Sequence, residues 1–113
     1  MRSLQDRRFG YIYNAWSDGE TKFRNESQSG LTFNAMVKAA ASDPAIAARV
    51  QHFVFRTKEE FYDYEADPDA LHNLIDDPAQ AAKVADFRRQ MRDAMAGSND
   101  PLLAKFESEI KIE

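Results

Sequence analysis

The first residues alternate between apolar and polar side chains in the way that a β-strand requires. Around Tyr11, aromatic residues recur at every second position, and Ile12 places an apolar side chain on the opposite face. We therefore expect short strands at residues 2–5 and 9–16, joined by a turn at residues 6–8. Because the second strand is apolar on both faces, it must be covered on both sides.

A second aromatic run, at residues 60–64, also has the composition of a β-strand. It is followed by Asp67-Pro68 and then by Asp77-Pro78. The residue before a proline is kept out of the α region, and the proline itself has a backbone angle φ that suits a first helical turn. The sequence therefore predicts a strand, one helical turn after Asp67 and a long helix after Asp77.

The longest helix is expected at residues 79–96. Asp77 suits the N-cap position of this helix, and Gly97 suits the position just beyond its last turn. Apolar residues recur at three- and four-residue spacing, which is typical of a helix with one buried face. The buried stripe should consist of Val84, Phe87, Met91 and Met95.

Three shorter helices complete the pattern. One covers residues 32–41, a second follows Asp43-Pro44, and a third follows Asp100-Pro101. All four prolines of the chain follow an aspartate, whose carboxylate can accept hydrogen bonds from the free amides of a new turn. We therefore assign the four aspartates to capping rather than to catalysis. The apolar stripes are Phe33, Met36, Val37 and Ala40; then Ile46, Ala47, Val50 and Val54; then Leu103, Phe106 and Ile110.

Together these elements predict an α+β fold. A small antiparallel sheet, made of the N-terminal hairpin and the strand near residues 60–64, should pack against the long C-terminal helix and the shorter helices. With 113 residues, of which 43% are hydrophobic, the chain has the size of one domain. We expect a single domain over residues 1–113, in which the polar residues 17–30 form a mobile loop.

The composition argues against several classes of partner. A net charge of −4 disfavours nucleic acid, which is bound by concentrated Lys and Arg. No apolar run approaches the ~20 residues of a membrane helix, and residues 1–10 lack the apolar segment of a signal peptide, so no compartment is indicated. Without cysteine, the chain has no disulfide, thiol nucleophile or Cys-ligated zinc.

Acidic residues at positions 63, 65, 67 and 69 alternate as ligands do in a calcium-binding loop. An EF-hand loop would, however, need a glycine where Pro68 lies and a glutamate where Leu74 lies. Neither His52 nor His72 has a second His or Cys at a ligand spacing, and no Gly-x-Ser-x-Gly motif or phosphate-binding glycine loop occurs. We therefore assign no catalytic, cofactor-binding or metal-binding residue in this chain.

The hairpin and the central strand also follow a recognisable order of residues. The hairpin supplies Arg2, Arg8, Phe9, Tyr11, Ile12 and Asn14, and the later run supplies Glu60, Phe61, Tyr62, Asp63, Tyr64, Asp67, Pro68, Asn73, Leu74, Asp77 and Pro78. This order resembles the C-terminal domain of sulfatases of the heparan N-sulfatase and arylsulfatase type, in the alkaline phosphatase superfamily. The resemblance spans residues 1–103. The departures are Gly10 at a usual Lys, Phe61 and Tyr64 at two leucines, and Ala70 where the family often has Glu.

The resemblance implies a non-catalytic C-terminal subdomain whose partner is the N-terminal catalytic domain of a sulfatase. That domain would carry the Cys/Ser-x-Pro-x-Arg signature, the formylglycine made from it and the bound calcium. The nearest sequence here, residues 42–46, lacks the arginine. The parent enzyme would hydrolyse sulfate esters or sulfamates of sulfated sugars. Without that domain, the docking face would be exposed and would favour self-association.

Two alternatives remain open. The chain could be a stand-alone α+β protein-interaction module, which needs no catalytic residues. It could also be the tail of a related phosphonate or phosphodiester hydrolase of the same superfamily. The coding region upstream of Met1 distinguishes the three.

Overall fold

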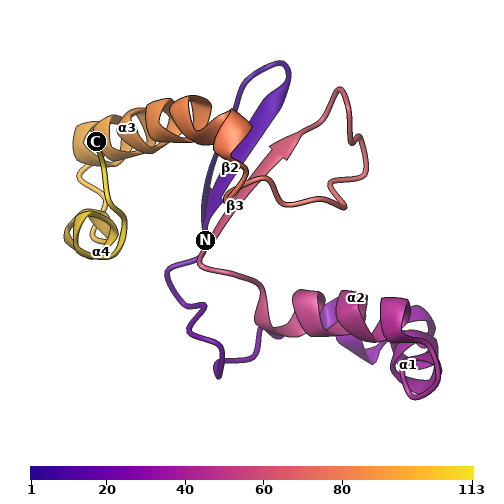
Figure 1. Cartoon of the computed structure of the whole chain (residues 1–113). Helices are drawn as coiled ribbons and strands as arrows, with labels where there is room; N and C mark the ends of the chain where they lie inside the picture. Colours follow the sequence, from indigo (N-terminus) through magenta and orange to yellow (C-terminus); the bar gives the residue numbers. More distant parts are fainter. The chain divides into compact units, whose positions relative to one another are not determined.

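The structure is a computed structural model that describes residues 1–113. It has the predicted α+β fold, with a three-stranded antiparallel sheet and α-helices (Figure 1). The chain divides into two compact units, Met1–Ala15 with Glu59–Glu113 and Trp16–Lys58, while the expected single domain stays a prediction. The elements are β1 (Arg2–Gln5), β2 (Phe9–Tyr13), a 3₁₀ helix (Glu26–Ser29), α1 (Leu31–Ala39), α2 (Pro44–Phe55), β3 (Glu59–Asp63), a second 3₁₀ helix (Pro78–Gln80), α3 (Ala81–Gly97) and α4 (Leu103–Glu109).

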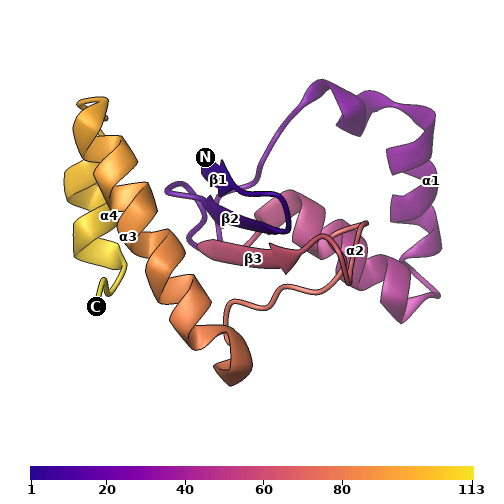
Figure 2. The same ribbon diagram turned by 90° about the horizontal axis from the view of Figure 1, so that it is seen from above.

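The three strands form one sheet in the order β1-β2-β3, and both pairs are antiparallel (Figure 2). Tyr11 pairs with Leu4 on β1 and with Phe61 on β3, so these three side chains share one face. The predicted bounds of β1 are confirmed. Strand β2 is shorter than predicted and β3 begins one residue earlier, because the ladder between them ends at the pair of Tyr13 and Glu59.

Helices α3 and α4 supply the other half of the core of this unit (Figures 1 and 2). The rings of Phe61 and Phe87 meet edge to face with centroids 5.3 Å apart, and those of Tyr13 and Phe106 do so at 4.9 Å. Such pairs contribute about 0.5–1.5 kcal/mol beyond the burial of their surface. The predicted stripe of α3 is confirmed as buried: Val84, Phe87, Met91 and Met95.

Two of the four Asp-Pro pairs cap helices as predicted. The carboxylate of Asp43 accepts hydrogen bonds from the amides of Ala45 and Ile46 at 2.9 and 3.2 Å. That of Asp77 accepts from the amide of Ala79 at 2.9 Å, although the first turn after it is a 3₁₀ helix that leads into α3. Each such cap contributes about 1 kcal/mol.

The other two pairs differ from each other. Asp100 accepts from the amide of Leu102 at 2.9 Å in the turn that precedes α4. No helix forms after Asp67: the amide of Ala70 donates to the carbonyl of Asp67 at 3.1 Å in a single turn, and the carboxylate of Asp67 accepts from the amide of His72 at 2.8 Å, which closes a loop. Within this loop Ala70 has a φ of 52°, a left-handed conformation that ends any right-handed turn.

The C-terminal end of α3 is made by an asparagine rather than by the predicted glycine. Gly97 is the last residue of α3, and the left-handed residue is Asn99, with a φ of 53°. The amide of Asn99 donates to the carbonyl of Ala96 at 3.1 Å, and the amide of Asp100 donates to that of Met95 at 2.9 Å. This pair of hydrogen bonds is the Schellman motif, in which Asn is the usual alternative to Gly.

Residues 16–58 have a different kind of interior. Phe53 on α2 contacts the ring of Phe23 at 6.4 Å and that of Phe33 at 5.5 Å. These rings are only partly buried, and no apolar side chain of this unit is fully buried. The unit is therefore held by an open aromatic cluster and by the contact between α1 and α2.

The predicted loop at residues 17–30 contains the 3₁₀ helix Glu26–Ser29. Two hydrogen bonds tie the start of the loop to the end of α2: Ser17 Oγ donates to the carbonyl of Phe55 at 2.9 Å, and the amide of Phe23 donates to that of Val54 at 2.7 Å. The mobility of the loop stays a prediction. None of the helices combines the length and apolar character that crossing a bilayer requires.

Candidate functional site

The Asn-Leu pair of the family-like run fastens the chain to strand β3. Asn73 Oδ1 accepts hydrogen bonds from the amides of Phe61 and Ile75 at 2.8 and 3.1 Å, and Asn73 Nδ2 donates to the carbonyl of Glu59 at 3.1 Å. The amide of Leu74 donates to the carbonyl of Phe61 at 2.7 Å. Because these contacts satisfy backbone groups of β3, residues 73 and 74 protect the strand from pairing with another chain.

The Arg-Asp pair of the pattern joins the hairpin to the same strand. Arg8 donates from Nε to Oδ1 of Asp63 at 3.0 Å and from Nη2 to Oδ2 at 2.7 Å, and the amide of Tyr64 donates to the carbonyl of Arg8 at 2.8 Å. The hydrogen bonds from Arg8 lower the pKa of Asp63, with the amides of Ala66 and Glu65 adding to the effect. Asp63 is therefore an ionised anchor of the turn rather than an acid placed to react.

The opposite face of the sheet holds a buried polar group. Glu60 is fully buried; its Oε2 accepts from Asn14 Nδ2 at 2.8 Å, and its Oε1 accepts from the hydroxyl of Tyr62 at 2.7 Å. A buried carboxylate needs such donors, because its desolvation is costly. The hydrogen bond from Asn14 links the residue after β2 to β3, and that from Tyr62 lies within β3.

The packing on the sheet face that carries Glu60 and Tyr62 explains why residue 10 is a glycine. It pairs with Tyr62, whose ring lies near that of Tyr64, with centroids 6.4 Å apart. A Cβ at position 10 would overlap the ring of Tyr64, so a side chain there would displace it. Gly10 and Tyr64 both depart from the sulfatase pattern, and the absence of a side chain at position 10 makes room for the ring of Tyr64.

A second polar cluster, on the helix-covered face, was not anticipated from the sequence. Arg88 on α3 donates from Nε and Nη2 to the two carboxylate oxygens of Glu59, both at 2.8 Å, and the hydroxyl of Tyr11 donates to Glu59 Oε1 at 2.6 Å. Burial, and then the neighbouring Glu59 carboxylate, raises the pKa of Tyr11 above its usual range. The helical spacing predicts that Phe87 is buried, and Arg88 is the next residue. It does not reveal which strand residue forms the ion pair with Arg88.

The acidic residues at positions 63–67 are held by separate partners or by an arginine. Asp63 and Glu65 both pair with Arg8, the latter at 3.5 Å, while Asp67 binds a backbone amide of its own loop. In the structure, no group of three or more His, Cys, Asp or Glu side chains is placed where it could hold a metal ion. The geometry of this region fits a structural role in which acidic side chains link segments of the chain.

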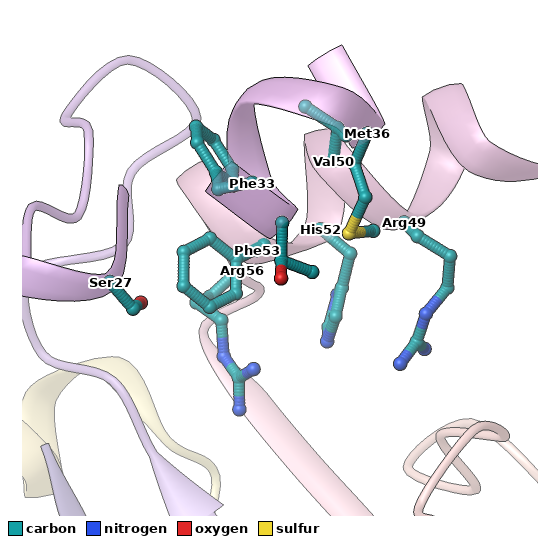
Figure 3. Close-up of a pocket in the computed structure, with 9 residues that line it drawn as sticks. Ser27, Phe33, Met36, Arg49, Val50, His52, Phe53 and Arg56 are labelled. Carbon is teal, nitrogen blue, oxygen red and sulfur yellow. The ribbon is translucent and has the colours of Figure 1, made fainter. Parts of the chain in front are cut away.

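A hollow lies elsewhere in the chain, between α1 and α2 in residues 16–58. It is a cavity of about 230 Å³ (Figure 3). Its wall is mainly apolar, and Ser27 and Thr32 add hydroxyl groups. The apolar residues are Phe33, Met36, Val50 and Phe53.

Two basic residues of α2, Arg49 and His52, and the residue after it, Arg56, also line this cavity. Figure 3 shows their side chains leaving the helix in a common direction. Arg56 is the C-cap of α2 and has a φ of 51°. This backbone conformation is uncommon for a residue with a Cβ and costs about 1–3 kcal/mol. No acidic side chain lines the cavity.

The sequence does carry a signal for these basic residues. Positions 49, 52 and 56 follow the spacing i, i+3 and i+7, which places them on one face of a helix. The search for metal ligands, which need His or Cys at set spacings, does not detect this pattern of two arginines and one histidine. The cavity itself depends on how α1 packs on α2, which periodicity does not show.

No protein-family model matches the chain, and no curated protein matches it. The likeness to sulfatases therefore stays a prediction, based on the order of residues in the two runs.

Proposed function

We propose that the chain is a non-catalytic C-terminal subdomain of a sulfatase, and that its catalytic partner domain hydrolyses sulfate esters or sulfamates of sulfated sugars. The observation that carries this proposal is the role of the family-like residues. Arg8, Asp63 and Asn73 join three separated segments of the chain to one another. Residues that serve a scaffold are expected to link separate segments of the chain in this way.

The cofactors of such an enzyme would belong to the partner domain. Calcium needs several free oxygen ligands, whereas both oxygens of Asp63 are bound by Arg8, and no group of acidic residues is arranged as a site. Formylglycine would require the signature that residues 42–46 lack, and there Asp43 caps α2. These residues therefore serve to hold segments of the fold in position.

The coding region upstream of Met1 tests the proposal. We expect an open reading frame that continues into a segment with Cys or Ser, one residue, Pro, one residue and Arg. An upstream frame with a metal-binding Thr or Ser and no such signature would instead indicate a phosphonate or phosphodiester hydrolase. A stop codon directly before Met1, with no neighbouring catalytic gene, would overturn the sulfatase proposal.

A biochemical test complements the genetic one. We expect the purified 113-residue chain to show no hydrolysis of an aryl sulfate, and we expect it to increase the soluble yield of the catalytic domain when the two are expressed together. Turnover by the chain alone, after removal of contaminating enzymes, would contradict a scaffolding role.

A second candidate function is a stand-alone interaction module. Leu31 on α1 is 90% exposed and Val37 is 46% exposed, so α1 presents apolar side chains to its surroundings. The same upstream sequence separates the candidates, because a module requires no catalytic partner. Self-association of the isolated chain, which we expect in either case, is measured by sedimentation over a range of concentrations.

A further inference from the structure

The cavity between α1 and α2 combines features that seldom occur together in a packing defect. Its wall is made by Phe33, Met36, Val50 and Phe53, which give an apolar surface, while arginine side chains lie at its edge. A void left by imperfect packing is expected to be lined by apolar groups alone. Ligand pockets, by contrast, have an apolar wall and a few polar groups that fix orientation.

The charge at this edge has one sign. Arg49 is exposed and makes no ion pair, and the other titratable side chains that line the cavity are His52 and Arg56. Because no acidic side chain lines the cavity, a negative group would meet attraction and no local repulsion. The planar guanidinium of Arg49 suits a carboxylate or sulfonate, with which it can form two hydrogen bonds.

The volume limits the ligand. At about 230 Å³, the cavity lies below the ~300–1,000 Å³ of sites for drug-sized ligands. The occupant should therefore be a small molecule of one or two rings, or a short alkyl chain. The rings of Phe33 and Phe53, with centroids 5.5 Å apart, provide aromatic surface for such a group.

We propose that residues 16–58 bind a small amphiphilic anion, with its apolar body between α1 and α2 and its carboxylate, sulfate or sulfonate group at Arg49. This proposal does not depend on the sulfatase assignment, because it uses only the geometry of the cavity. The proposal assigns a ligand to residues 16–58, whereas the scaffolding role concerns the sheet and the segments bonded to it.

The test titrates the full chain with four probes in a calorimeter. The anions are naphthalene-2-sulfonate and naphthalene-2-carboxylate, 2-naphthol is the neutral counterpart, and inorganic sulfate is the head group alone. We expect both anions to bind, 2-naphthol to bind about tenfold more weakly, and sulfate to show no binding, since one charge-assisted hydrogen bond is worth about a factor of ten. Comparison of the two anions shows which head group the site prefers.

Three variants locate the site. Arg49→Gln should weaken both anions about tenfold and leave 2-naphthol unchanged. Val50→Phe should fill the cavity and weaken all three naphthalene probes. Lys38→Gln, which removes an equal charge from the exposed face of α1, is the matched control and should bind like the unaltered chain. Circular dichroism confirms that each variant is folded.

Three results would overturn the proposal. One is the absence of binding by either anion, and another is equal binding of 2-naphthol and the anions, which would show that the basic edge has no role. The third is an equal loss in Lys38→Gln and Arg49→Gln, which would indicate attraction by overall charge. Because Arg49 is exposed, its variant should fold even if Val50→Phe does not.

Discussion

The two units of the molecule differ in how they use aromatic residues. In the unit formed by residues 1–15 and 59–113, most aromatic side chains of the sheet and helices are buried, and all fully buried apolar residues of the chain lie here. In residues 16–58, Phe23 and Phe33 each contact Phe53, and all three rings stay partly exposed. The same helical periodicity can therefore form a closed core or the wall of an open cavity.

Truncating a core aromatic should give the largest effect. Phe61 is fully buried, so Phe61→Ala should lower the free energy of unfolding by about 3–5 kcal/mol, through lost burial and a residual cavity. Phe33→Ala, in the open cluster, should cost about 1 kcal/mol, because only part of its surface is removed from water. Urea denaturation followed by circular dichroism measures both. Equal losses would show that the two units are packed alike.

Alkaline pH should affect one unit selectively. Burial and neighbouring carboxylates raise the pKa of Tyr11 and of Tyr13, through Glu59 and Glu109 respectively. A group whose pKa is higher in the folded chain adds stability below its unfolded pKa of about 10 and loses it as the pH rises further. Stability should therefore fall above about pH 10.

All four tyrosines belong to the unit with the closed core, and Trp16, the single tryptophan, belongs to the other. Tyrosinate absorbance and tryptophan fluorescence therefore report separately on the two units in the alkaline titration. We expect the absorbance change to be delayed relative to free tyrosine. A titration without a delayed part would contradict the raised pKa of Tyr11 and Tyr13.

Removal of the amide that fastens the loop to β3 should have an intermediate effect. Asn73→Ala deletes three hydrogen bonds to backbone groups, and at about 0.5–1.5 kcal/mol each, reduced by exposure, the loss should be about 2 kcal/mol. Asn34→Ala on α1 is the control, because its side chain makes a single 3.5 Å contact with Ser29. Hydrogen exchange of the Phe61 amide should accelerate only in Asn73→Ala.

Deletion of a helix cap tests the open unit. Asp43→Ala removes the acceptor of two amides at the start of α2 and should cost about 1 kcal/mol. Since this unit has no closed core, the loss should appear as faster exchange throughout α2. Ser42→Ala, one residue earlier, should have no measurable effect. Unchanged exchange in Asp43→Ala would show that packing alone holds the helix.

Acid should give a gradual loss in both units. Hydrogen bonds from Arg8 and Arg2 lower the pKa of Asp63 and Asp100, and backbone amides lower that of Asp18 to about 2. A lowered pKa adds stability above the unfolded value of about 3.9, and this stability is lost as the pH falls through the folded value. Urea midpoints should be similar at pH 7 and 5 and lower at pH 4 and 3, with a smaller decrease in Asp63→Asn. A rise in stability below pH 4 would contradict these pairings.

Much of the fold followed from local patterns. The alternation around Tyr11 predicted a strand, the stripe that contains Phe87 predicted α3, and Asp43 and Asp77 marked helix starts. These predictions succeed because periodicity and capping depend on neighbours within about four residues. At Asp67 only a single turn forms and the carboxylate caps no helix, because the same dipeptide also suits a loop closed by a more distant amide.

The sequence alone determined the order of the elements, the buried stripe of α3 and the aspartates that begin helices. Local patterns do not show that Arg88 pairs with Glu59, that Asn73 is bonded to β3 or that Arg49 lines a cavity; these contacts are visible only in the folded chain. The physical reason is range. A side-chain hydrogen bond between residues far apart in the chain depends on strand register and helix packing, and these arise from all the contacts of the fold together.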